Sequence, residues 1–190
     1  MKIIFITILA LIMLLSFGCA TPTVTNTKRS AEEQLLCTKA VDLAFEKITF
    51  TQVSNKKVFI ENKLLEASDK EYLQGTVKYK LVNSGAIISD DKENSDIIVE
   101  LFSGCVGTSH KKWLGGIPEM GIPVPLAGTV SIPEIAFFKR VRQAGYCKTK
   151  MIMVDRKTGK SILYIPLLFG ESYHNHFFIL FFPFTTSNIL

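Results

Sequence analysis

The sequence is short of the side chains from which catalytic sites are usually built. It has three histidines, four cysteines and one tryptophan in 190 residues. It contains no Gly-x-Ser-x-Gly elbow for a serine nucleophile, and no Gly-rich loop that ends in the Lys-Ser or Lys-Thr of a phosphate site. The positive charges are scattered among acidic ones without a basic stripe and interleaved aromatics, so no nucleic-acid binding is expected. These absences predict a protein that is not an enzyme and needs no cofactor.

Two of the three histidines are the nearest approach to a metal site. His174 and His176 stand two residues apart, so on a strand both rings would point to one side, where they could bind an ion. No third ligand of fixed spacing accompanies them. The sequence therefore predicts no metal site.

The chain has one long apolar run, at residues 3–15, and it follows the single charge of Lys2. This arrangement is typical of a secretory signal, and the run is shorter than the about 20 residues of a membrane-spanning helix. The segment Leu-Ser-Phe-Gly-Cys at 15–19 resembles the bacterial lipobox, although Ser16 and Phe17 depart from its usual pattern. An ordinary secreted protein or an uncleaved anchor remains the alternative.

The lipobox resemblance implies that the thiol of Cys19 receives a diacylglycerol, that residues 1–18 are cleaved, and that the new amine is acylated with a fatty acid such as palmitate. One acyl chain anchors weakly, whereas two or three hold a protein firmly on a bilayer. Ala20 rather than Asp follows the cysteine, which resembles the pattern of lipoproteins sent to the outer membrane. We therefore expect a lipid-anchored protein of the outer membrane that faces the periplasm.

Three cysteines would remain beside the acylated one: Cys37, Cys105 and Cys147. An odd number allows one disulfide at most in an oxidising compartment. Two alternatives stay open, a bridge between Cys105 and Cys147 or three small buried apolar side chains.

The pattern of the remaining chain predicts a tether at 19–29, rich in Thr and Pro, and a single α/β domain at 30–190. Ser30 and Glu33 form a capping box for a helix at 31–47, and Ser68 with Glu71 forms another for a helix that ends near 83. Strands are expected at the following positions: 56–62, 86–89, 96–107, 135–141 (with a turn at 143–146), 150–155 and 161–166. The predicted fold is α/β (α+β), one mixed sheet of about five to six strands with two helices on one face.

Residues 111–134 hold four of the seven prolines and four of the twelve glycines. Proline cannot serve a central strand and glycine weakens one, so this segment is predicted to be a long loop. The loop is apolar, and its function would be contact with a partner or a bilayer. The candidate contact residues are Trp113, Leu114, Ile117, Ile122 and Val124. A loop folded back over the sheet as core is the alternative, and the apolar stretch 177–184 is a second candidate contact surface.

Short motifs across residues 30–170 resemble those of an uncharacterised bacterial lipoprotein family, a domain of unknown function. They lie at 33–36, 40–42, 57–59, 106–108, 116–118, 123–125, 133–140 and 155–159. This resemblance implies no activity, because the family has none assigned. The strand order and the turn at 155–160 are more distantly similar to the α/β domains of curli-secretion-channel and penicillin-binding-protein-activator lipoproteins.

The sequence thus predicts a non-enzymatic cell-envelope lipoprotein, a tethered binding or accessory module of the outer membrane. Its partners would be the membrane, through the lipid anchor, and an envelope protein. The alternative is an oligomeric secretion-type or channel-type assembly subunit. Its strands would have to alternate in polarity to cross a membrane, and the segments 135–143 and 176–184 do not alternate cleanly.

Overall fold

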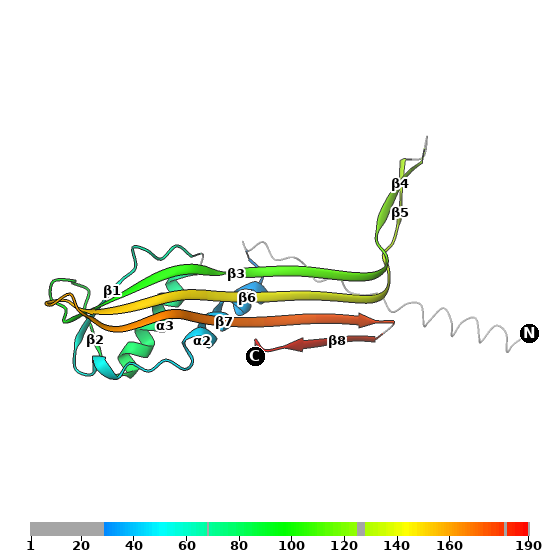
Figure 1. Cartoon of the computed structure of the whole chain (residues 1–190). Helices are drawn as coiled ribbons and strands as arrows, with labels where there is room; N and C mark the ends of the chain where they lie inside the picture. Colours follow the sequence, from blue (N-terminus) through cyan, green and yellow to red (C-terminus); the bar gives the residue numbers. More distant parts are fainter. Residues whose placement is uncertain (1–28, 68, 125–127, 181, 190) are drawn as a thin grey trace, which may run out of the picture. The chain divides into compact units, whose positions relative to one another are not determined.

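The computed structural model describes residues 29–67, 69–124, 128–180 and 182–189. The predicted signal sequence and Cys19 lie outside the described residues. The chain divides into one unit formed by residues 1–30 and a second formed by residues 31–190. All the helices and strands discussed below belong to the second unit (Figure 1).

The first half of this unit has the predicted order of strand, helix and strand, and it forms a βαβ arrangement. Helix α2 (Ala31–Phe45) and the short 3₁₀-helix η1 (Thr51–Val53) precede strand β1 (Lys57–Glu61). Helix α3 (Lys70–Asn83) then leads to strand β2 (Ile87–Ile88) and to the long strand β3 (Ile97–Ile117). Strand β1 pairs in parallel with both β2 and β3. The N-cap of α3 is Asp69 rather than the predicted Ser68, which lies outside the described residues.

The second half is antiparallel. Strands β6 (Ile135–Asp155), β7 (Ser161–Ile179) and β8 (Phe182–Ser187) complete a mixed six-stranded sheet in the order β2-β1-β3-β6-β7-β8. The predicted hairpin turn between β6 and β7 is confirmed: the carboxylate of Asp155 accepts hydrogen bonds from Thr158, and Gly159 has φ +68°. Strands β4 (Met120–Val124) and β5 (Gly128–Ile132) form a separate two-stranded sheet.

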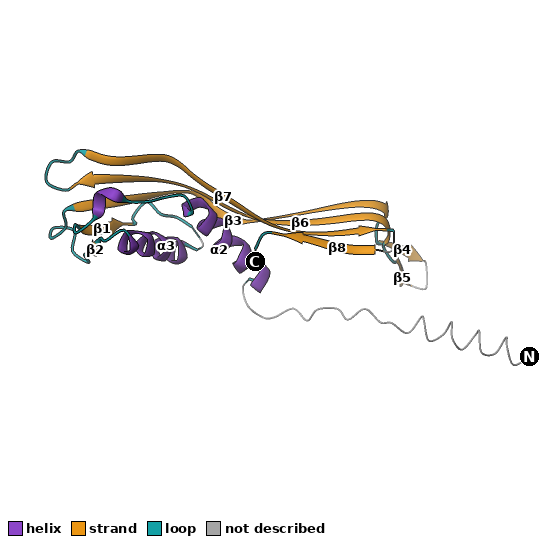
Figure 2. Cartoon of the chain, turned by 90° about the horizontal axis from the view of Figure 1, so that it is seen from below, coloured by secondary structure: helices purple, strands orange, loops and turns teal. Residues whose placement is uncertain are grey.

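The predicted α/β class fits, although strands dominate and the prediction of a single sheet misses the β4–β5 pair. Both helices contribute to one core with the sheet: Phe45 from α2, Leu73 and Val77 from α3. On β3 the core residues Val99 and Leu101 alternate with more exposed ones, which is the pattern of a sheet covered on one face. The two helices lie on that face (Figure 2).

Helix α2 lies unusually close to the sheet because glycines face it. A Cβ atom on Gly170 of β7 would lie 1.9 Å from the carbonyl oxygen of Ala40, and one on Gly145 of β6 would lie 2.3 Å from that of Leu36. The hydroxyl of Ser172 donates a hydrogen bond to the same Leu36 oxygen at 2.6 Å. These backbone contacts fix the position of α2 along β6 and β7.

Two sequence predictions are wrong in this region. Residues 111–134 are not a long loop, since β3 runs to Ile117 and the β4–β5 hairpin follows. Pro123 is tolerated inside β4 because that strand has a partner on one side only. The predicted turn at 143–146 is also absent, and β6 runs through it. A glycine is needed at position 145 because α2 packs directly against the strand there, not because the chain turns.

The long strand β3 keeps one face toward the helices through a β-bulge. Ser103 pairs with Thr149 but Cys105 pairs with Lys148, so Gly104 is the extra residue. The bulge changes which residues face the helices, from odd-numbered ones before it to even-numbered ones after it. Val106, after the bulge, therefore belongs to the same core as Val99.

Cys105 and Cys147 are not joined by a disulfide. Val106 is the register partner of Cys147, so the preceding residue, Cys105, points to the opposite face of the sheet. Cys147 is buried, and burial, with Cys105 and Cys37 nearby, raises the pKa of its thiol to about 12. The alternative of small buried side chains therefore holds for Cys37 and Cys147 but not for the exposed Cys105.

We expect Gly170→Ala to lower the free energy of unfolding by about 2 kcal/mol or more, because the new methyl group pushes α2 off the sheet. Gly107→Ala is the matched control, since a Cβ there meets nothing within 4 Å. Urea unfolding of residues 20–190, which include the compact unit and its core, measures both changes. Equal effects of the two substitutions would contradict the packing described above.

Candidate functional site

Strands β3, β6 and β7 continue beyond the first turn of α2, and β8 is added there (Figure 2). We call this part the outer sheet: residues 110–117 of β3, 135–143 of β6, 173–179 of β7 and all of β8. Its side chains become more exposed with distance from α2, and every residue of β8 is exposed. The outer sheet is therefore a surface rather than a core.

One face of the outer sheet carries a continuous set of apolar side chains, which we call the aromatic face. Residues opposite each other in paired strands share a face, and the register places the residues in rows. One row runs through Trp113, Arg140, Phe177 and Phe184, and the next runs through Gly115, Phe138, Ile179 and Phe182. The aromatic face consists of Trp113, Ile117, Ile135, Phe138, Phe177, Ile179, Phe182 and Phe184.

Most of the aromatic face is exposed to solvent. Phe182 exposes 75% of its surface and Trp113 exposes 64%. The rings of Phe177 and Phe184 stack on each other, with centroids 4.9 Å apart and planes 8° apart. A contiguous exposed patch of this kind marks a contact site in most proteins.

Basic side chains lie on the same face, on the side nearer α2. The guanidinium of Arg140 lies over the ring of Phe177, 5.1 Å from its centroid. Arg142 forms an ion pair with Glu171, and Lys111 is its register partner on β3. The apolar residues thus occupy the far end of the strands, and a row of basic residues separates them from the helix-covered part.

The opposite face of the outer sheet, which we call the polar face, carries charged and imidazole side chains together with an apolar groove. The carboxylate of Glu134 accepts hydrogen bonds from the ammonium groups of Lys112 and Lys139. Beside this triad lies a groove of about 600 Å³. Its lining includes Ala136, Val141, His176, Phe178 and Pro183.

The contrast between the two faces is hidden in the sequence by two irregularities. Gly115 pairs with Phe138 and Gly116 pairs with Ala136, so Phe137 is an extra residue in a bulge. Leu180, with φ +55°, belongs to the turn between β7 and β8. Each irregularity shifts the alternation by one residue, and for this reason the segments 135–143 and 176–184 do not read as alternating.

The structure places the predicted contact residues as follows. Trp113 and Ile117 lie on the aromatic face, whereas Leu114 points to the opposite face and is half-buried. Ile122 is exposed on β4. The side chain of Val124 lies outside the described residues. The exposure of Trp113 and Ile122 excludes the alternative of a segment folded back as core.

Sequence reasoning missed other members of the aromatic face, Ile135 and Phe138 among them. The only sequence signal for them is the apolar start of the segment 135–143, which does not show what these residues lie next to. The pairing of β6 with β3 and β7 places them beside Trp113 and Ile179.

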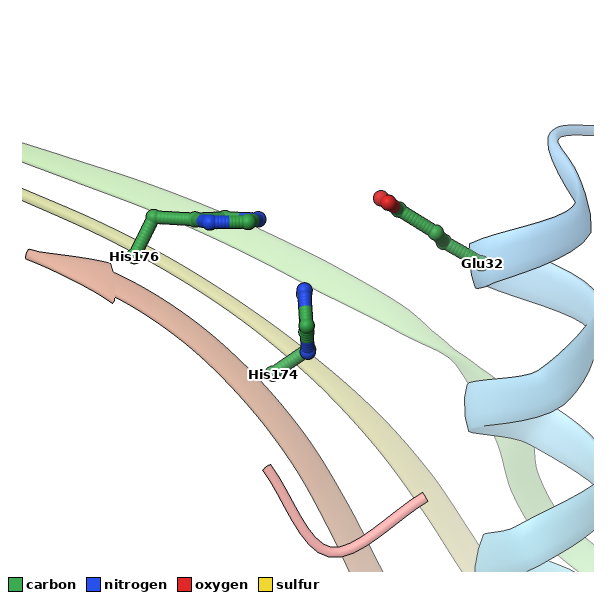
Figure 3. A group of neighbouring side chains, drawn as sticks. All are labelled: Glu32, His174 and His176. Carbon is green, nitrogen blue, oxygen red and sulfur yellow. The ribbon is translucent and has the colours of Figure 1, made fainter. Parts of the chain in front are cut away.

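A second cluster lies on the polar face, where α2 begins. The side chains of Glu32, His174 and His176 each offer a ligand atom, and these three atoms lie within 4.8 Å of one another. The two imidazole rings have centroids 4.4 Å apart and planes 87° apart. Figure 3 shows both rings and the carboxylate pointing toward a common space. The third candidate ligand, which the sequence spacing did not reveal, comes from helix α2.

None of the helices among the described residues is long and apolar enough to cross a membrane. The chain belongs to a family of unknown function, DUF6655, whose model matches residues 12–189. Among curated proteins, none matches the chain.

The triad of Glu134, Lys112 and Lys139 predicts a pH dependence of stability. Hydrogen bonds from Lys112 and then Lys139 lower the pKa of Glu134. A lowered folded-state pKa stabilises the fold above the unfolded-state pKa of about 4.3, and the contribution is lost as the pH falls through the folded-state value. We therefore expect Glu134→Gln to be less stable than the parent at pH 7, with a difference that shrinks below about pH 4. Urea unfolding across pH 3–7 measures it, and a difference independent of pH would contradict the assignment.

Proposed function

We propose that this member of a family without an assigned activity is a non-enzymatic lipoprotein of the outer membrane, facing the periplasm. Its aromatic face would enter one leaflet of a bilayer, and the protein would serve as a tethered accessory module of the envelope. The exposed aromatic face with its basic row is the observation that carries this proposal. The absence of recognisable catalytic motifs in the sequence supports a non-enzymatic role.

The length of the aromatic face favours one leaflet over a complete crossing. From Trp113 to Ile117 the strand advances four residues, or about 14 Å at about 3.4 Å per residue. The hydrocarbon core of a bilayer is about 30 Å thick, so this length matches about half of it. Strands that cross a bilayer need about 9–11 residues.

The basic residues that adjoin the aromatic face, on its side nearer the helices, suit the lipid headgroup layer. Lys111 and Arg142 lie one row nearer the helices than Trp113. Tryptophan concentrates at membrane interfaces, and basic side chains near anionic lipids add about 1 kcal/mol each. Acylation of Cys19 would keep the chain at the bilayer, so the aromatic face would need only a modest affinity of its own.

A second candidate is the oligomeric assembly subunit, and the strand edges favour it. Within the described residues, β8 has no neighbour on its outer side, and neither does β3 beyond its pairing with β1. Open strand edges are templates for pairing with another chain. Light scattering in mild detergent decides this question, because a mass equal to one copy would exclude the assembly.

Co-sedimentation with vesicles of phosphatidylethanolamine and phosphatidylglycerol tests the leading proposal on residues 20–190, which lack the lipidated cysteine. We expect the parent to bind and the double variant Phe138→Ser, Phe182→Ser to bind at least about tenfold more weakly, because each phenylalanine contributes about 2 kcal/mol when it leaves water.

The matched control is Tyr79→Ser with Tyr164→Ser, which removes two exposed aromatic rings outside the outer sheet. This control should bind vesicles like the parent. Equal binding by both double variants would contradict a role of the aromatic face, and no binding by the parent would overturn the proposal.

A further inference from the structure

We propose that Glu32, His174 and His176 form a binding site for a divalent ion of the zinc class, independently of the function proposed above. The two histidines come from one face of β7, and the glutamate comes from the first turn of α2 (Figure 3). A strand and a helix that are far apart in the sequence thus supply the three ligands.

The position of Glu32 follows from the packing of α2 along β7. Ala40 meets Gly170, and one helical turn earlier Leu36 meets Ser172. One helical turn advances about 5.4 Å and two strand residues advance about 6.8 Å, so the two periods nearly match. One turn before Leu36 the helix reaches Glu32, and two residues after Ser172 the strand reaches His174. The backbone contacts that fix the fold therefore also hold the three ligands together.

The separations suit a small ion. Zinc ligands lie about 2.1 Å from the metal, which puts neighbouring ligands of a tetrahedral site about 3.4 Å apart. The three ligand atoms here lie within 4.8 Å of one another, so binding has to close the longest gap by no more than about 1.4 Å. Glu32 is exposed and its side chain has three rotatable bonds, which allow this adjustment.

The hydrogen bonds around the rings leave room for an ion. Nδ1 of His176 lies 3.3 Å from the hydroxyl of Thr185, a contact that orients the ring and leaves Nε2 for a metal. Two buried polar atoms beside the cluster have no hydrogen-bond partner in the described part of the chain: Nδ1 of His174 and Oε1 of Gln143, its neighbour across the strands. Buried polar atoms are nearly always paired, and a water molecule between these two would satisfy both while the outer nitrogen of His174 stays directed at the common space.

The types of ligand indicate which class of metal ion the site would bind. Imidazole nitrogens suit zinc and the later first-row metals, whereas magnesium and calcium prefer oxygen ligands. Two histidines and one glutamate leave the fourth position of a tetrahedral ion to water. A bound ion would join the first turn of α2 to β7, at the boundary between the helix-covered sheet and the outer sheet.

Titration calorimetry of zinc chloride into residues 20–190, freed of metal by a chelator, tests the site. We expect one ion per chain, and an affinity at least tenfold weaker in His176→Ala and in Glu32→Gln. His110→Ala removes the histidine outside the cluster and is the matched control, so its affinity should equal that of the parent. Both Glu32 and His176 are exposed, and circular dichroism checks that their variants fold.

A second measurement separates a built site from scattered binding to histidines. Thermal unfolding should shift upward with zinc in the parent and in His110→Ala, and much less in Glu32→Gln, because an ion that binds the folded state stabilises it. The proposal is overturned if the parent binds no zinc, if Glu32→Gln binds it like the parent, or if His110→Ala loses as much affinity as His176→Ala.

Discussion

The rest of the structure depends on the contact between the backbone of α2 and the backbones of β6 and β7. Gly145 and Gly170 leave no room for a side chain, so α2 can occupy only one place along these strands. Because α2 starts at Ala31, the strands beyond it have no helix to cover them in the described chain. The same contact sets Glu32 over His174 and His176. One packing constraint thus determines where the core ends, which surface is open and where the candidate ligands meet.

The outer sheet differs from the core in how its two faces are used. Beneath the helices, one face is buried and carries Val99, Leu101 and Met151. Beyond them, the continuation of that buried face becomes the polar one, with the Glu134 triad and the histidines, while the opposite face becomes aromatic. A sheet that changes its apolar face along its length makes one contact with its own helices and leaves a second apolar face open to a contact outside the unit. The proposed contact of the second kind is a single leaflet of a bilayer.

Local signals in the sequence were enough for the elements that depend on local physics. Helix α2, the β1–α3–β2 order and the turn at Gly159 follow from periodicity and turn residues. The prediction of a long loop at 111–134 was wrong for two reasons. Pro118 and Pro133 lie between strands rather than within them, and Gly115 and Gly116 lie opposite a β-bulge in paired strands rather than in a loop. Gly145 looked like a turn residue because its reason, the carbonyl of Leu36, is more than 100 residues away in the chain. For the same reason the third ligand candidate, Glu32, had no spacing to reveal it.

The measurement that tests the central claim most directly is the fluorescence of Trp113, the single tryptophan of the chain. It lies on the aromatic face and is exposed in the free protein. If this face enters a leaflet, adding vesicles to residues 20–190 will shift the emission to shorter wavelengths and protect it from iodide, and lipids with brominated acyl chains will quench it. An emission that stays unshifted and fully open to iodide on vesicle-bound protein would contradict the account.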